Sequence, residues 1–120
     1  MALRKITTIP LFKRTVTGAS GTAGTSISDP IDLREISAIG NFSMSYGIAG
    51  TAATAGSTVF EYLGSPIYDG TYIAAGTFGT FGGVASGIIS FSPVTIPFMK
   101  IKAVSGTSAV ALITAELNVR

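Results

Sequence analysis

The stretch PFMKIKAVSGTSAVALITAELNV, residues 97–119, contains the clearest secondary-structure signal in the chain. Residues 97–104 alternate apolar and polar side chains, and much of residues 109–119 does the same. Ser105-Gly106-Thr107-Ser108 separates the two runs. Two runs of period two that are joined by a short glycine-containing loop are typical of a β-hairpin. The sequence therefore predicts a hairpin over residues 97–119.

Shorter periodic segments occupy most of the remaining chain, and turn-forming residues separate them. The clearest is residues 41–48, where alternate apolar side chains from Phe42 to Ile48 face one way. Pro30 cannot donate a hydrogen bond to a sheet, so a break or bulge is expected where it interrupts residues 26–33. In that segment Ile27, Ile31 and Leu33 are separated by even numbers of positions, so they are expected on one face of the strand. Other strands are expected over residues 11–17, 57–63, 71–74 and 87–92, and one helical turn over residues 34–39.

The spacing of these segments favours one fold class. About eight short strands with turn signals between them and almost no helix predict an antiparallel β-sandwich or barrel, with a jelly roll as the leading form. The chain has 120 residues, which is the length of one domain that can bury its own core. We expect a basic arm over residues 1–9 and a single β-sandwich domain over residues 10–120.

Residues 76–83 contain a short direct repeat, GTFGTFG, that predicts a flexible loop. Phe78 and Phe81 lie in this repeat, and exposed phenylalanines are costly on the surface of a monomer. We expect one ring to fold back onto the core and the other to contact a neighbouring molecule.

The composition excludes several kinds of chemistry. The chain has no Cys and no His, which removes thiol nucleophiles, disulfides, the usual zinc ligands and the commonest general base. No cofactor and no metal are therefore expected. Charged residues make up 12% of the chain, about half the usual share. A surface poor in charge resembles subunit interfaces, which predicts a homo-oligomer, a trimer or larger. The alternative is a monomer with a surface coated by Ser and Thr.

Positive charge gathers near the start of the sequence, at Arg4, Lys5, Lys13 and Arg14. Such a segment can dock on an acidic partner surface or on nucleic acid. Four charges with no aromatic platform beyond Phe12 argue against direct contact with nucleic acid. The alternative is a solvated terminal segment.

Lys100 and Lys102 are the only positive charges between Arg34 and Arg120, and they share one face of a predicted strand. Two interpretations stay open. The lysines form a plain row facing solvent, or the row lies against an acidic neighbour.

The remaining polar residues give no catalytic motif. Asp29, Asp32 and Glu35 are close in sequence, but their spacing matches no calcium loop and no paired-carboxylate site. The chain has no Gly-x-Ser-x-Gly elbow and no Gly-Lys-Ser/Thr phosphate loop. We therefore expect no enzyme. Tyr46, Tyr62, Tyr68 and Tyr72 provide the aromatic rings on which a sugar would stack, although each fits equally well in the core.

No apolar run approaches the roughly 20 residues of a membrane-spanning helix. The first residues, MALRKITT, lack the apolar core of a signal peptide. These features predict a soluble chain that is made in the cytoplasm and does not enter a membrane.

Several short stretches carry a resemblance when they are taken in order. They are SDPIDL (residues 28–33), FSMSY (42–46), VFEYLGS (59–65), YDGTY (68–72), FSP (91–93) and FMKIKA (98–103). Together they resemble small structural proteins of tailed bacteriophage particles, over about residues 26–119. The resemblance implies a β-sandwich in the virion that decorates or stabilises the capsid, or belongs to the tail. It also implies the major capsid protein or another virion protein as partner, and it brings no catalytic residues.

These observations lead to two hypotheses. The first is a non-enzymatic virion structural protein that acts by self-association and by docking on the particle. Its candidate partner contacts are Arg4, Lys5, Lys13, Arg14, Phe78, Phe81, Lys100 and Lys102. The second is a carbohydrate-binding or host-adhesion module that uses tyrosines on one face. Location in the head, the connector or the tail is left open.

Overall fold

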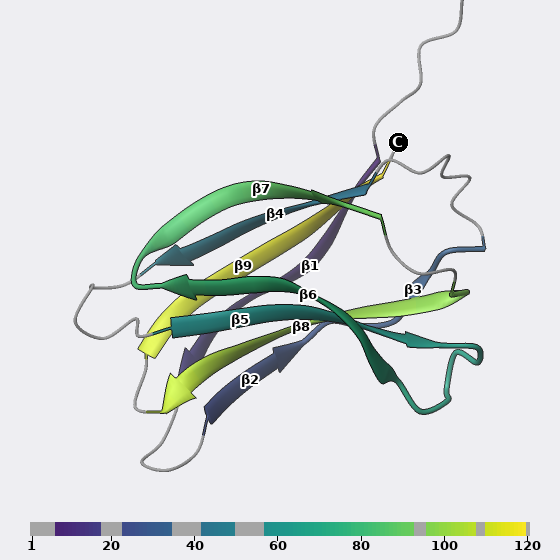
Figure 1. The fold of residues 1–120 in the computed structure, drawn as a ribbon, viewed down its shortest axis with the longest axis horizontal. Helices are drawn as coiled ribbons and strands as arrows, with labels where there is room; N and C mark the ends of the chain where they lie inside the picture. The colour runs from purple at the N-terminus through teal and green to yellow at the C-terminus, as the bar shows by residue number, and fades with distance from the viewer. Residues whose placement is uncertain are drawn as a thin grey trace, which may run out of the picture.

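The computed structural model describes residues 7–17, 23–34, 42–49, 57–92, 96–107 and 110–119, and these residues form nine strands (Figure 1). The strands are β1 (Thr7–Thr17), β2 (Ala23–Ile27), β3 (Ile31–Asp32), β4 (Phe42–Ala49), β5 (Ser57–Ser65), β6 (Ile73–Gly82), β7 (Ala85–Phe91), β8 (Phe98–Thr107) and β9 (Val110–Val119). Among these residues there is no helix long and apolar enough to cross a membrane.

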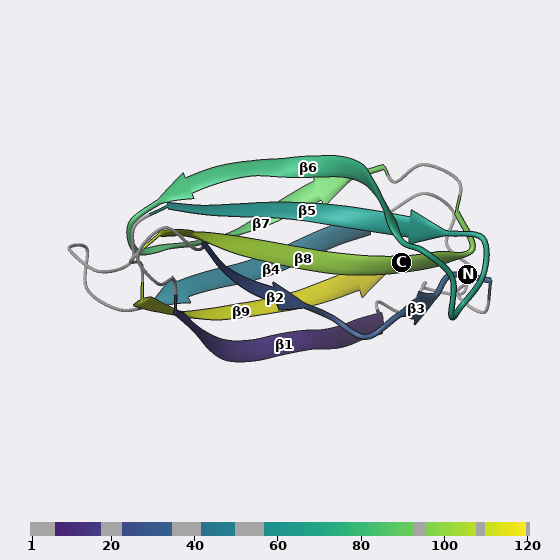
Figure 2. The same ribbon diagram turned by 90° about the horizontal axis from the view of Figure 1, so that it is seen from below.

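The strands form two antiparallel sheets that face each other (Figure 2). One has the order β1-β9-β4-β7 and is called the β9 sheet; the other has the order β2-β8-β5-β6, with β3 also paired to β8, and is called the β8 sheet. Most connections cross from one sheet to the other, and only β2–β3 and β5–β6 stay within a sheet. This order, with its crossing connections, is that of a jelly roll. The predicted β-sandwich is therefore confirmed.

The hairpin predicted over residues 97–119 is wrong. Both of its strands exist, but β8 pairs with β5, β2 and β3, whereas β9 pairs with β1 and β4. The connection between β8 and β9 therefore crosses from one sheet to the other. Two alternating strands and a short loop look the same in sequence for a hairpin and for such a crossing, because both bury one face of each strand.

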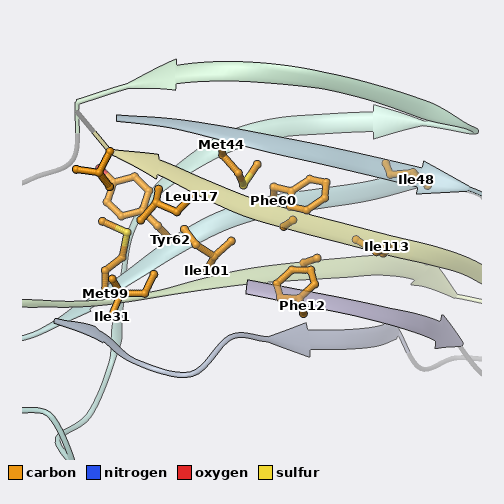
Figure 3. Close-up of a cluster of buried hydrophobic side chains, with 13 residues drawn as sticks. Phe12, Ile31, Met44, Ile48, Phe60, Tyr62, Met99, Ile101, Ile113 and Leu117 are labelled. Carbon is orange, nitrogen blue, oxygen red and sulfur yellow. The ribbon is translucent and has the colours of Figure 1, made fainter. Parts of the chain in front are cut away.

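The core fills the space between the sheets (Figure 3). In β5, Phe60 and Tyr62 point inward, and in β4 Met44 and Ile48 do so. The pattern predicted for residues 41–48 and 57–63 is confirmed, because each strand buries one face and leaves the other partly open. The buried cluster also contains Phe12, Ile31, Met99, Ile101, Ala103, Ile113, Ala115, Leu117 and Val119.

Residues 76–83 were expected to form a flexible loop, and that prediction is wrong: most of them belong to β6. The register between β5 and β6 shifts twice, and Gly79 has a φ of 125°, which a residue with a side chain rarely adopts. These irregularities break the alternation that would have identified the strand. They also let Phe78 and Phe81, three positions apart, pack on the same side.

The break at Pro30 is confirmed, because β2 ends at Ile27 and β3 begins at Ile31. The expectation that Ile27, Ile31 and Leu33 lie on one face is wrong. Ile27 is exposed whereas Ile31 is buried, since the irregular residues between the two strands change which side faces inward. The helical turn predicted over residues 34–39 lies mostly outside the described residues, and Arg34 is part of a bend.

Candidate functional site

Lys100 and Lys102 lie on the outer face of β8 because the residues between and beside them face the core. Met99, Ile101 and Ala103 are fully buried, so the alternation of the strand turns both lysines outward. Both lysines are half-buried, since neighbouring strands flank β8 on each side. Their common face is confirmed.

Lys102 already has an acidic neighbour in its own chain. Glu61 of β5 lies directly opposite Lys102 in the register, and the Lys102 Nζ is 3.3 Å from the Glu61 Oε1. The exposed fractions of the two side chains are 30% and 25%. This ion pair supplies an acidic neighbour without another molecule, and a partner contact by Lys102 stays a prediction.

Lys100 lies over an aromatic ring. Its Nζ is 4.4 Å from the centre of the Tyr72 ring, which is the geometry of a cation–π contact. The Tyr72 hydroxyl donates a hydrogen bond of 2.8 Å to the carbonyl oxygen of Tyr68. Burial raises the pKa of the Tyr72 phenol, and the nearby Tyr68 and Asp69 raise it further. Tyr72 is therefore neutral and fixed in place at neutral pH.

The same end of the β8 sheet holds an aromatic and basic cluster, which we define as Arg34, Tyr68, Tyr72, Phe98 and Lys100. Tyr68 packs edge-on against Phe98 with ring centres 5.6 Å apart, and the Arg34 guanidinium lies 4.7 Å from the centre of the Phe98 ring. Tyr68 is 50% exposed. The cluster therefore offers one accessible aromatic ring beside cations that are held in place.

The two phenylalanines of the repeat both fold back into the sandwich. Phe78 packs against Phe91 at 4.7 Å between ring centres, and Phe81 packs against Tyr46 at 4.6 Å. Each also contacts an aromatic ring of β5. Both rings are therefore half-buried against the core, and not only one of them. Contact of one ring with a neighbouring molecule stays a prediction.

The basic N-terminal residues are only partly described. Arg4 and Lys5 lie outside the described residues, and so does the side chain of Arg14. Lys13 is exposed on β1, where it lies opposite Thr114 of β9 on the outer face of the β9 sheet. Residues 7–9 of the expected arm belong to β1.

The carboxylates do not gather into a catalytic or metal site. In the described ranges there is no group of three or more acidic, His or Cys residues that could hold a metal ion. Asp29 and Asp32 line one shallow hollow of about 290 Å³ between β1 and the β2–β3 segment. Asp32 is engaged with Arg34, whose Nη2 lies 3.0 Å from its carboxylate. Glu35 lies outside the described residues.

A different surface stands out that the sequence did not suggest. β4 and β7 contain no charged residue, yet Val84, next to β7, and Ile88, within it, are 52% and 72% exposed. Ile88 lies in the middle of β7, on the outer face of the β9 sheet. In the sequence GIISF, Ile88 and Ile89 are adjacent, and only one of the two can face the core. That alternation was the signal that could have identified an exposed isoleucine.

Comparison with known proteins places the fold and not the family. No protein-family model and no curated protein matches the chain. Among solved structures, the PBSX exported protein XepA is similar with a TM-score of 0.66 and 6% identity over 94% of this chain. The aligned region covers 36% of the XepA chain, so this chain spans about a third of that protein's length. The C-terminal CBM6 of LamC from Zobellia galactanivorans aligns over 94% of this chain and 98% of its own, with 13% identity and a TM-score of 0.49.

Proposed function

We propose that the protein is a non-enzymatic structural component of a tailed-bacteriophage particle, which acts by associating with copies of itself and docking on other particle proteins. The observation that carries the proposal is the uncharged side of the sandwich, where large aliphatic side chains are exposed. Exposed apolar surface of this kind marks sites of protein association.

Two further features support this function. The sequence resembles small structural proteins of tailed phages in six stretches that follow one another along the chain. The jelly roll is also a fold that viral capsid proteins use. The major capsid protein or another virion protein is the proposed docking partner, and the virion is the proposed location of a chain that is made in the host cytoplasm.

The charged groups fit an adhesive role better than a catalytic one. Glu61 and Asp32 are each engaged with a basic side chain of the same chain, so neither is a free acid or base. The proposed mechanism therefore needs no metal, no cofactor and no bond-breaking step. Binding energy would come from apolar surface removed from water.

Purified particles test this proposal directly. Antibody labelling in electron micrographs should place the protein on the virion, and the purified protein should sediment as an oligomer. A strictly monomeric protein that never associates with particles would contradict the proposal.

A carbohydrate-binding module is the second candidate function, and the aromatic and basic cluster favours it. Tyr68 exposes half of its surface next to the ordered Tyr72 and Lys100, and sugars stack on such rings. A glycan array with the wild type, Tyr68→Ala and Lys13→Ala tests this function. Binding that is lost only in Tyr68→Ala would support it, and absence of binding to any glycan would remove it.

A further inference from the structure

We propose that β7 is the strand through which two copies of this chain associate, edge to edge and antiparallel, about a twofold axis at Ile88. The two β9 sheets would then join into one continuous eight-stranded sheet. This inference rests on the proposed function, because it names the surface that self-association uses.

The first step is that β7 is an open edge. The β9 sheet has the order β1-β9-β4-β7, so within the described residues β7 is paired on one side only, with β4 (Figure 1). An open edge presents unpaired backbone donors and acceptors, which another strand can satisfy.

The second step is that the other three sheet edges carry features that discourage pairing. β1 contains Pro10, a bulge between Pro10 and Phe12, and the exposed Lys13. β2 is only five residues long and its register is shifted. β6 is irregular, with two register shifts and a positive φ at Gly79. Prolines, charges, short length and bulges are the means by which proteins protect edges.

The edge of β7 has none of these protections. It contains no proline and no charge over Ala85–Phe91, and its register with β4 runs without a shift from Phe91 to Ala85. Ile88 is 72% exposed at the centre of the strand. A regular, uncharged edge with an exposed isoleucine is either a liability or an interface.

The third step identifies the occupant as a second copy, because the strand is complementary to itself. In an antiparallel pair centred on Ile88, each Ile88 lies opposite its counterpart on the outer face. Ser86 then lies opposite Ser90 of the other copy. On the inner face small residues meet large ones: Gly87 lies opposite Ile89, and Ala85 lies opposite Phe91. A twofold interface requires this self-complementarity, and cross-strand apolar pairs stabilise it.

A twofold pair predicts a dimer or another even-numbered assembly, which differs from the trimer that was among the states expected from composition. The uncharged strand offers nothing to attract a strongly acidic or basic peptide. A strand from another protein would also need a large residue opposite Gly87 and a small one opposite Ile89. In a second copy of this chain, the twofold symmetry provides that match.

The first test uses the absence of Cys from the chain. Opposite residues in an antiparallel pair have Cα atoms about 4.5–5.5 Å apart, and a disulfide spans about 4.4–6.8 Å. Ile88→Cys is therefore expected to form a covalent dimer rapidly under mild oxidation. Ile73→Cys is the control, since Ile73 is similarly exposed but lies on β6. Equal cross-linking of the two variants would overturn the inference.

The second test uses paired charges, with the native mass as readout. Ile88→Lys alone and Ile88→Glu alone are each expected to be monomeric, because like charges then lie opposite each other. Mixing the two variants should restore a dimer that contains one of each. Ile73→Lys should keep the wild-type mass. Circular dichroism checks that all variants fold, which the exposure of both positions favours.

The outcomes separate this inference from the proposed function. If the wild type forms an odd-numbered assembly and Ile88→Lys leaves that assembly intact, the role of β7 is overturned. The proposed self-association is then still supported. A wild type that is monomeric overturns both. A dimer that depends on Ile88 but is absent from phage particles supports the inference and contradicts the proposed function.

Discussion

Lys102 and Glu61 lie directly opposite each other on β8 and β5, with 3.3 Å between the ammonium nitrogen and the nearer carboxylate oxygen. The pair joins two adjacent strands of the β8 sheet and neutralises half of the lysine row. Its two side chains keep only about a third or less of their exposure. Charge on this face therefore has a role inside the fold as well as any role in contact with a partner.

Reversing the charge at Lys102 should lower stability. Lys102→Glu places two carboxylates opposite each other, and a like-charge pair of this kind costs about 1 kcal/mol or less. Urea unfolding measures the change. The double swap, Lys102→Glu with Glu61→Lys, should recover most of it. A double swap that is as unstable as the single variant would show that the pair contributes nothing.

Adding a methyl group at Gly76 should destabilise the fold. A Cβ built there would lie 2.5 Å from the Cε1 of Tyr62, whose ring is buried and cannot move aside freely. Gly76→Ala is expected to cost about 1–3 kcal/mol in the free energy of unfolding.

Gly82→Ala is the matched control for Gly76→Ala on the same strand, because no atom lies within 4 Å of its Cβ position. It should change stability by less than about 0.5 kcal/mol. Equal effects in thermal unfolding would contradict the close approach of β6 to Tyr62.

Truncating Phe81 separates a packing role from a contact role. Its ring touches both sheets, since it packs against Tyr46 of β4 and Phe60 of β5. Phe81→Ala should therefore lower the free energy of unfolding by about 2 kcal/mol or more. An unchanged melting temperature together with weaker assembly would instead identify the ring as a partner contact.

High pH should weaken the hydrogen bond from Tyr72 to Tyr68. The folded pKa of Tyr72 is raised above 10.0, so the phenol keeps its proton more firmly in the folded than in the unfolded chain. The stabilisation is then fully present below pH 10 and is lost as the pH rises through the folded pKa. Tyr72→Phe removes this dependence. The difference in stability between wild type and variant should shrink above pH 10, and a constant difference would contradict it.

The buried hydroxyl of Thr58 should be dispensable. Thr58 is fully buried, and within the described part of the chain its Oγ1 has no hydrogen-bond partner. Thr58→Val keeps the shape of the side chain and removes the unpaired hydroxyl, so it should raise stability by about 1 kcal/mol.

Ser28→Ala is the contrasting variant, because the Ser28 hydroxyl accepts a hydrogen bond of 2.9 Å from the Ile101 amide. It should lower stability by about 1–3 kcal/mol. Denaturant titrations that rank the two variants in the opposite order would contradict this assignment of partners.

The sequence predicted the strands of this fold better than their partners. Residues 41–48 could be assigned to a strand because large apolar residues alternate with small ones, and β4 shows the same alternation of buried and partly open positions. The pairing of β8 could not be assigned. Its neighbours β5 and β2 lie about 40 and 80 positions away in sequence, and local periodicity contains no information about such distant contacts.

The candidate site was only partly predictable for a related reason. The common face of Lys100 and Lys102 follows from alternation within one strand. The acidic partner of Lys102 depends on the register between β5 and β8, which the sequence does not show. The exposure of Ile88 also follows from alternation, but the open edge beside it could not be predicted, because edge positions appear only when the whole sheet order is known.

The pairing of β1 with β9 has a consequence for how the chain folds. Thr7 lies opposite Val119, so a residue near the beginning of the sequence meets one near its end. β9 also lies between β1 and β4, so until β9 has been synthesised β1 has no partner among the described strands and β4 has only β7. Such distant contacts slow folding. The β9 sheet of a growing chain therefore stays incomplete until β9, the last of the described strands, has emerged from the ribosome.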